Sequence, residues 1–232
     1  MDSISASIMN GLTADDIIKY GVKLMIIFLV VPIHEYAHAW AAHKLGDETP
    51  VYQGRLTLNP IKHIDPLGAI CLFVAGFGWG KPVEVNPLRF KWYRKGNALC
   101  AAAGPISNLI VGLIGMVIYK FTLYASWANS SEALSWVAVI FSYFTAINVG
   151  LAVFNLIPIP PLDGSKIFAY FIGPKWDGFM YRNQTAIRIA FVLLIISPVL
   201  NRPLSWIQGI MFTVMDKLTF FVDIIAKAIF GV

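Results

Sequence analysis

Three ionisable side chains lie within five residues of one another in an apolar run that extends over residues 21–42: His34, Glu35 and His38. A run of about 20 predominantly apolar residues is long enough to cross the hydrocarbon core of a bilayer as a helix. Ionisable groups at that depth are costly and are tolerated where they face a polar cavity or one another. Other segments of the chain must therefore enclose this part of the helix, and the three residues are expected to be functional.

The composition places the whole chain among membrane proteins. Of its 232 residues, 57% are hydrophobic and 13% are charged, against about 25% charged residues in an ordinary soluble domain. The net charge of +5 comes from lysines and arginines in short loops beside apolar runs, which is the positive-inside pattern. We expect no nucleic-acid partner. A single membrane-embedded domain is expected over residues 1–232, with a core at about 17–166 and C-terminal helices at about 186–232.

The apolar runs predict where the chain crosses the bilayer. A first helix is expected over residues 17–45, and two further spans over residues 97–119 and 134–157. Two later runs cover residues 186–200 and 205–232, and charged residues interrupt the last one, which fits either a span or an interfacial amphipathic helix. The expected fold class is an all-α polytopic membrane protein with about four to six transmembrane helices.

The stretch between the first two spans is expected to be irregular. Its apolar piece, residues 66–80, is short for a span and has basic loops on both sides, so a re-entrant or partly buried segment is favoured. The phrases P-V-Y-Q-G-R-L-T-L and F-G-W-G-K-P-V-E-V suggest short strands. Non-helical backbone at membrane depth must lie against protein or a wet cavity. A small membrane-embedded β element is therefore expected after the first core helix, beside the site.

The phrase H-E-Y-A-H (residues 34–38) has the spacing of a zinc site. On a helix it places His34 and His38 on one face, where both imidazoles can hold zinc, and Glu35 where it can take a proton from a bound water. A candidate third ligand, Asp163, lies in the phrase N-L-I-P-I-P-P-L-D-G (residues 155–164). The prolines of that phrase cannot continue a helix, so Asp163 is expected on irregular backbone.

The charge pattern brings these residues to one depth. With the basic loops inside, both the first helix and the span over residues 134–157 run from the outside to the inside. His38 and Asp163 then lie at the same level, on the order of 10 Å below the cytoplasmic surface. Taken alone, a Leu-Asp-Gly phrase is more often an ordinary turn, and the matched depth is what favours a metal site.

Three further polar residues are weaker candidates. Asn108, in the phrase G-P-I-S-N, could form a hydrogen bond across helices near the site, although helix packing explains it equally well. His43 and His63 lie in or near loops and are expected to be interfacial or solvated.

The two motifs resemble those of the site-2 protease family of intramembrane zinc metalloproteases, in its compact bacterial and archaeal branch. The likeness covers residues 30–166 and includes the G-P-I-S-N phrase. It implies one zinc ion held by His34, His38 and Asp163, with Glu35 as the general base. It also implies that Asn155, which opens the second motif, contacts the substrate or the oxyanion near the scissile bond, and we group Asn108 with it as a candidate.

The resemblance implies an intramembrane zinc metalloendopeptidase whose partners are transmembrane protein or peptide substrates and the lipid bilayer. It would lie in the inner membrane of a prokaryotic cell, with its active site toward the cytoplasmic side. Two alternatives stay open: a catalytically inactive relative that binds membrane helices, and a zinc transporter. No internal repeat supports the transporter, and the sequence indicates no oligomeric state.

Overall fold

The first membrane-spanning helix carries the H-E-Y-A-H phrase near its inner end. The computed structural model describes residues 14–75 and 78–231. Helix α2 (Ala14–Met25), a π-helical turn (Ile26–Val30) and α3 (Val31–Leu45) follow one another as one continuous span, Asp16–Leu45. The π-helical turn ends two residues before Pro32, which has no N–H to continue the regular hydrogen-bond ladder. The widened turn therefore precedes His34 by only four residues.

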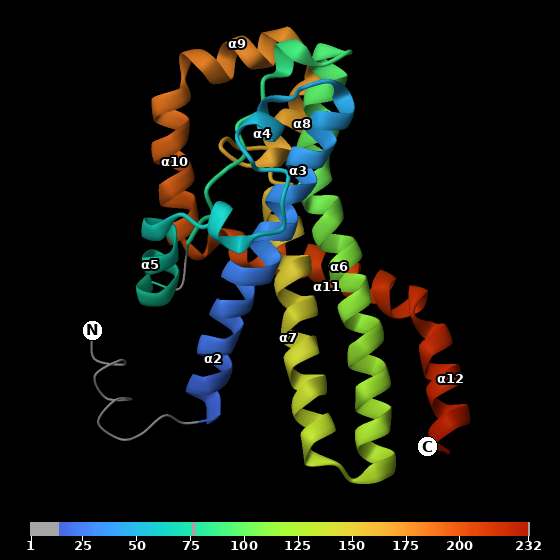
Figure 1. Cartoon of the computed structure of the whole chain (residues 1–232). Helices are drawn as coiled ribbons and strands as arrows, with labels where there is room; N and C mark the ends of the chain where they lie inside the picture. The colour runs from blue at the N-terminus through green and yellow to red at the C-terminus, as the bar shows by residue number, and fades with distance from the viewer. Residues whose placement is uncertain (1–13, 76–77, 232) are drawn as a thin grey trace.

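Two long antiparallel helices form the centre of the molecule. Helix α6 (Tyr93–Asn129) and helix α7 (Glu132–Asn155) pack side by side and join by a tight turn at the end of the molecule opposite to α9 (Figure 1). Together with the first helix they are the three helices of the described chain that are long and apolar enough to cross a membrane. The expected all-α polytopic membrane fold is confirmed. The span predicted at residues 97–119 lies within the longer helix α6, and the span predicted at residues 134–157 coincides with α7 to within two residues at each end.

The C-terminal part is a series of shorter helices. Helices α9 (Pro174–Arg182) and α10 (Gln184–Ile196) are bent by 81° and add a fourth span if they count as one. Helix α8 (Asp163–Ile172) precedes them, and α11 (Asn201–Leu218) and α12 (Phe220–Phe230) follow a short 3₁₀ turn, Pro198–Leu200.

Charged groups attach the C-terminal helices to α6. The buried Lys120 ammonium of α6 lies 2.7 Å from a carboxylate oxygen of Asp216 and 2.7 Å from one of Asp223. These ion pairs connect α6 with α11 and α12, and α12 packs along α6 in Figure 1.

The segment between α3 and α6 is irregular, and the expected β element is corrected. It contains α4 (Thr49–Tyr52), α5 (Pro66–Ala75) and two 3₁₀ turns, Pro60–Lys62 and Pro87–Arg89. Among the described residues no strand forms, and one isolated antiparallel bridge joins Ile64 to Gly80.

Short helices form in two parts of this segment. Residues 50–52, predicted as the start of a strand, lie in α4, where Pro50 is in the first helical turn, a position that favours the start of a helix. The 10-residue helix α5 is too short to span a bilayer, as expected for the apolar piece.

His63 is fully buried and not solvated as expected. Its Nε2 lies 2.7 Å from the carbonyl oxygen of Thr57, inside the loop. Beside it, the guanidinium of Arg55 donates to the carbonyl oxygens of Lys62 and Lys81. These bonds join the chain before α5 to the chain after Gly80.

Candidate metal centre

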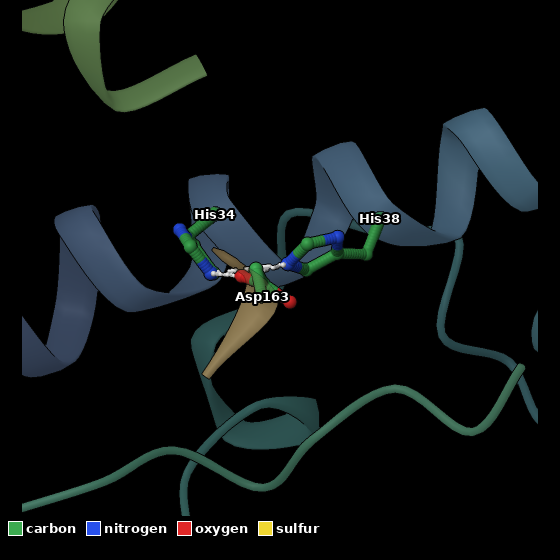
Figure 2. Close-up of side chains that lie close together, drawn as sticks. All are labelled: His34, His38 and Asp163. Carbon is green, nitrogen blue, oxygen red and sulfur yellow. Dashed lines mark hydrogen bonds and ion pairs between the residues drawn. The ribbon is translucent and has the colours of Figure 1, made fainter. Parts of the chain in front are cut away.

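Three ligand-type side chains converge from two elements. His34 and His38 project from one face of α3, and Asp163 is the first residue of α8 (Figure 2). The Oδ2 atom of Asp163 lies 3.1 Å from Nε2 of His38 and 3.3 Å from Nε2 of His34, and the two Nε2 atoms are 3.1 Å apart. All three side chains are buried.

These separations fit a metal ion. A tetrahedral zinc ion with bonds of about 2.0–2.1 Å keeps its ligand atoms roughly 3.3 Å apart. The three atoms occupy corners of a triangle of nearly that size. Two neutral imidazoles and a carboxylate are also an ordinary donor set for zinc, so the residues fit the ion.

The chain reaches Asp163 through a tight turn. Helix α7 ends at Asn155, before the three prolines of the phrase, and α8 begins at Asp163. A Cβ atom at Gly164 would overlap the backbone of Leu156, so only glycine lets the turn close this tightly. The expected unwinding before Asp163 is present, and Asp163 itself opens a helix.

The far side of each imidazole is held by α6. The Nδ1 of His38 lies 2.8 Å from the carbonyl oxygen of Cys100, and the Nδ1 of His34 lies 3.1 Å from the side-chain amide of Asn108. With Nε2 facing the metal, each Nδ1 carries the proton, so the Asn108 oxygen would be its acceptor. The amide nitrogen is the atom that lies against Nδ1, and the oxygen has no partner among the described residues, so a flip of the amide group would supply the acceptor. Asn108 is fully buried behind His34, where it can orient a ligand.

Gly104 leaves room for the ligand atoms. A Cβ atom at this position of α6 would overlap Nε2 of His38 and lie 2.7 Å from Nε2 of His34. The glycine of the G-P-I-S-N phrase is therefore required by the site. Sequence reasoning singled out only Asn108 in this phrase, although a glycine facing two histidines from a neighbouring span was the available signal.

The Asp163 carboxyl is held in its charged form. Burial alone would raise its pKa, but hydrogen bonds from His34 and His38, and the positive charge of these imidazoles when they are protonated, outweigh burial and hold the pKa below its usual range. A second cation, the Lys166 ammonium, lies 3.8 Å from Oδ1 of Asp163. The carboxylate is thus available as an anionic ligand at neutral pH.

Glu35 faces the same space from α3. Its Oε2 accepts a hydrogen bond of 2.8 Å from the backbone N–H of Val83, in the extended chain after Gly80. Glu35 and Asn155 both line the cavity that contains His34, His38 and Asp163. One N–H of the Asn155 amide donates to the carbonyl oxygen of Leu151 at 3.0 Å, which leaves its second N–H for another partner. The contact from Val83 had no signal in the sequence.

A polytopic helical membrane fold with two histidines, an aspartate and a neighbouring glutamate around a cavity is typical of a membrane-embedded zinc metalloprotease. The model of peptidase family M50 matches residues 22–197. The chain belongs to this family, which is that of the site-2 proteases, and it is a zinc metalloprotease whose cofactor is a zinc ion. The family assignment does not favour the zinc transporter.

Individual relatives agree with the family. YwhC of Bacillus subtilis, whose name assigns it as a zinc metalloprotease, is 41% identical over 195 residues, which cover 79% of this chain and 86% of YwhC. Rip2 of Mycolicibacterium smegmatis carries the same assignment and is 30% identical over 189 residues, 78% of this chain and 70% of Rip2. No solved structure matches the chain.

Proposed function

We propose that the protein is an intramembrane endopeptidase that hydrolyses peptide bonds within transmembrane segments. The observation that carries this proposal is the meeting of His34, His38, Asp163 and Glu35 in one cavity inside a bundle of membrane-spanning helices. A soluble substrate would not require a site at this depth.

Each residue has a distinct role in the proposed reaction. His34, His38 and Asp163 would hold the zinc ion. Zinc bound by three protein ligands supplies a Lewis acid that polarises the scissile carbonyl and lowers the pKa of water to about 7. Glu35 takes a proton from the attacking water and returns it to the leaving amine. The free N–H of the Asn155 amide donates to the oxygen on which negative charge develops.

The extended chain at Val83 suits a substrate that has lost its helical hydrogen bonds. Residues 81–86 run without a neighbouring strand in the described structure, so their outer edge can pair with an unwound peptide. Pairing there would satisfy the backbone groups that a helical substrate frees when it unwinds. The Val83 N–H on the inner edge contacts Glu35, which anchors this segment next to the general base.

We also propose that the site faces the cytoplasm, across a prokaryotic inner membrane. The start of α6, the end of α3, and helices α8 and α9 lie at one end of the molecule, opposite to the α6–α7 turn (Figure 1). Many of the lysines and arginines lie at that end, as the positive-inside rule predicts for cytoplasmic loops. The bacterial and archaeal sources of the relatives agree with a prokaryotic membrane.

Removal of zinc is expected to stop cleavage within apolar segments. Purified protein is incubated with detergent-solubilised bacterial membrane proteins, and new peptide termini are mapped by mass spectrometry, with and without a zinc chelator. We expect new termini inside predicted transmembrane segments, lost with the chelator and restored by added zinc. Termini confined to soluble loops, or cleavage that persists without zinc, would contradict the proposal.

Substitution of Asn108 by alanine is expected to weaken zinc binding without abolishing it. The change removes the amide that lies against Nδ1 of His34, and loss of such a partner typically lowers metal affinity by about 10- to 100-fold. The measurement is a competitive zinc titration. Asn148→Ala is the matched control, because Asn148 is equally buried on the neighbouring helix but donates to Phe144 of its own helix. Equal zinc affinity in both variants would contradict a ligand-orienting role.

A further inference from the structure

Two cavities of different chemistry meet at the candidate site. Both are lined by His34, Glu35, Asn155 and Pro161. Any peptide bond placed between Glu35 and Asn155 therefore has one cavity on each side. The side chains on the two sides of that bond would enter different surroundings.

The first cavity is an apolar chamber with about 780 Å³ of empty space. Besides the shared residues, its walls come from the first helix, from residues 78–80, from α7, from the turn before α8 and from α10. The sequence does not place these segments together. Phe191 of α10 is buried, and its ring centroid lies 6.4 Å from that of Phe154. The apolar and aromatic side chains that line the chamber include Ile26, Val31, Trp79, Leu151, Phe154 and Phe191.

The apolar chamber continues toward the lipid-facing side of the first helix. Ile26 lines both the chamber and a groove beside Ile18, Val22 and Tyr143. Those three residues also line an apolar groove of about 930 Å³ between α2 and α7. The chamber therefore lies on the side of the site from which the apolar part of a membrane segment would extend.

The second cavity is polar and has about 590 Å³ of empty space. It is lined by Asp163, by Asn97 near the start of α6, and by Lys166, whose side chain is half exposed. Once Asp163 serves as a ligand, Lys166 supplies a positive charge to this side. The cavity also lies toward the end of the molecule that carries the basic loops, where a membrane segment meets water.

We propose that these cavities are the two specificity subsites of the protease. The apolar chamber receives a large apolar side chain on one flank of the scissile bond, and the polar cavity receives a polar or acidic residue on the other flank. The substrate class is then a transmembrane segment cut where its apolar part gives way to polar residues. This inference rests on the proposed function and adds the register in which the substrate is cut.

The test profiles cleavage of a mixture of synthetic peptides of randomised sequence in detergent micelles, read by mass spectrometry. In the wild type, leucine, methionine or phenylalanine should exceed alanine on one flank by roughly tenfold or more, because each methylene in an apolar pocket is worth about 10-fold or more. Leu151→Trp narrows the chamber and should reverse this preference toward alanine. Phe191→Ala enlarges it and should admit tryptophan. Leu193→Trp is the matched control, since Leu193 is an exposed residue of α10 outside the chamber.

The outcomes separate this inference from the proposed function. Zinc-dependent cleavage with a flank preference that Leu151→Trp and Phe191→Ala leave unchanged would overturn the subsite alone. The same shift in Leu193→Trp would also overturn it, because the effect would not come from the chamber. If the wild type makes no zinc-dependent cuts, the proposed function is contradicted, and so is the subsite proposal that rests on it. A separate substitution, Lys166→Gln, should lower the preference for acidic residues on the other flank only.

Discussion

Substitution of Glu35 by glutamine is expected to reduce peptide cleavage by about 10²- to 10⁴-fold while zinc stays bound. Glutamine keeps the size of the side chain and can still contact the Val83 N–H through its amide oxygen. It cannot take a proton from water at neutral pH. The proposed zinc ligands are unchanged, so the variant separates proton transfer from metal binding. The measurement is the cleavage rate together with the zinc content of the same sample.

Glu84→Gln is the matched control for this experiment. Glu84 is an exposed neighbour of Val83 whose carboxylate accepts a hydrogen bond of 2.7 Å from Gln53. Its substitution removes the same charge close to the site without removing a group that lines the cavity. Wild-type cleavage by a verified Glu35→Gln sample would contradict the general-base role. Absence of cleavage in the wild type as well would favour the catalytically inactive relative.

The arrangement of the core could be predicted because each feature that determines it acts within its own stretch of sequence, and these features can be combined. The H-E-Y-A-H spacing places two histidines on one helical face whatever surrounds the helix. Prolines after Asn155 end α7 wherever that helix lies. Charge in the loops orients both helices in the same direction. These three effects together bring His34, His38 and Asp163 to one level, and the structure places their ligand atoms within 4.8 Å of one another.

Features that depend on contacts between distant segments could not be predicted. His63 carries no sign of burial in its own sequence neighbourhood, because its partner is a backbone carbonyl that the loop brings to it. The expected strands required a partner strand, and the chain instead forms α4 and an isolated extended segment at residues 81–86.

The apolar chamber shows the same limit at the candidate site. Its walls combine Val31, Leu151 and Phe191, which lie on three helices. From the sequence alone, each of these residues could equally well face lipid. Periodicity identifies an apolar face but does not say whether lipid or protein covers it. Site residues carried by one motif were therefore predictable, whereas the substrate-facing walls needed the tertiary structure.

Substitution of Asp163 by asparagine is expected to lower zinc affinity by at least about 100-fold, more than loss of a residue that only orients a ligand, and to abolish cleavage as a result. Asparagine keeps the shape of the side chain and one oxygen, but it removes the anionic ligand that lies 3.1 Å and 3.3 Å from the two histidine nitrogens. Asp177→Asn is the matched control, because Asp177 pairs with Arg94 at 2.9 Å on the exposed side of α9. Zinc titration and cleavage should change in Asp163→Asn alone. An Asp163→Asn sample with full zinc affinity would show that the third ligand lies elsewhere, and excess zinc that restores cleavage would show that the carboxylate binds the ion without a further part in the reaction.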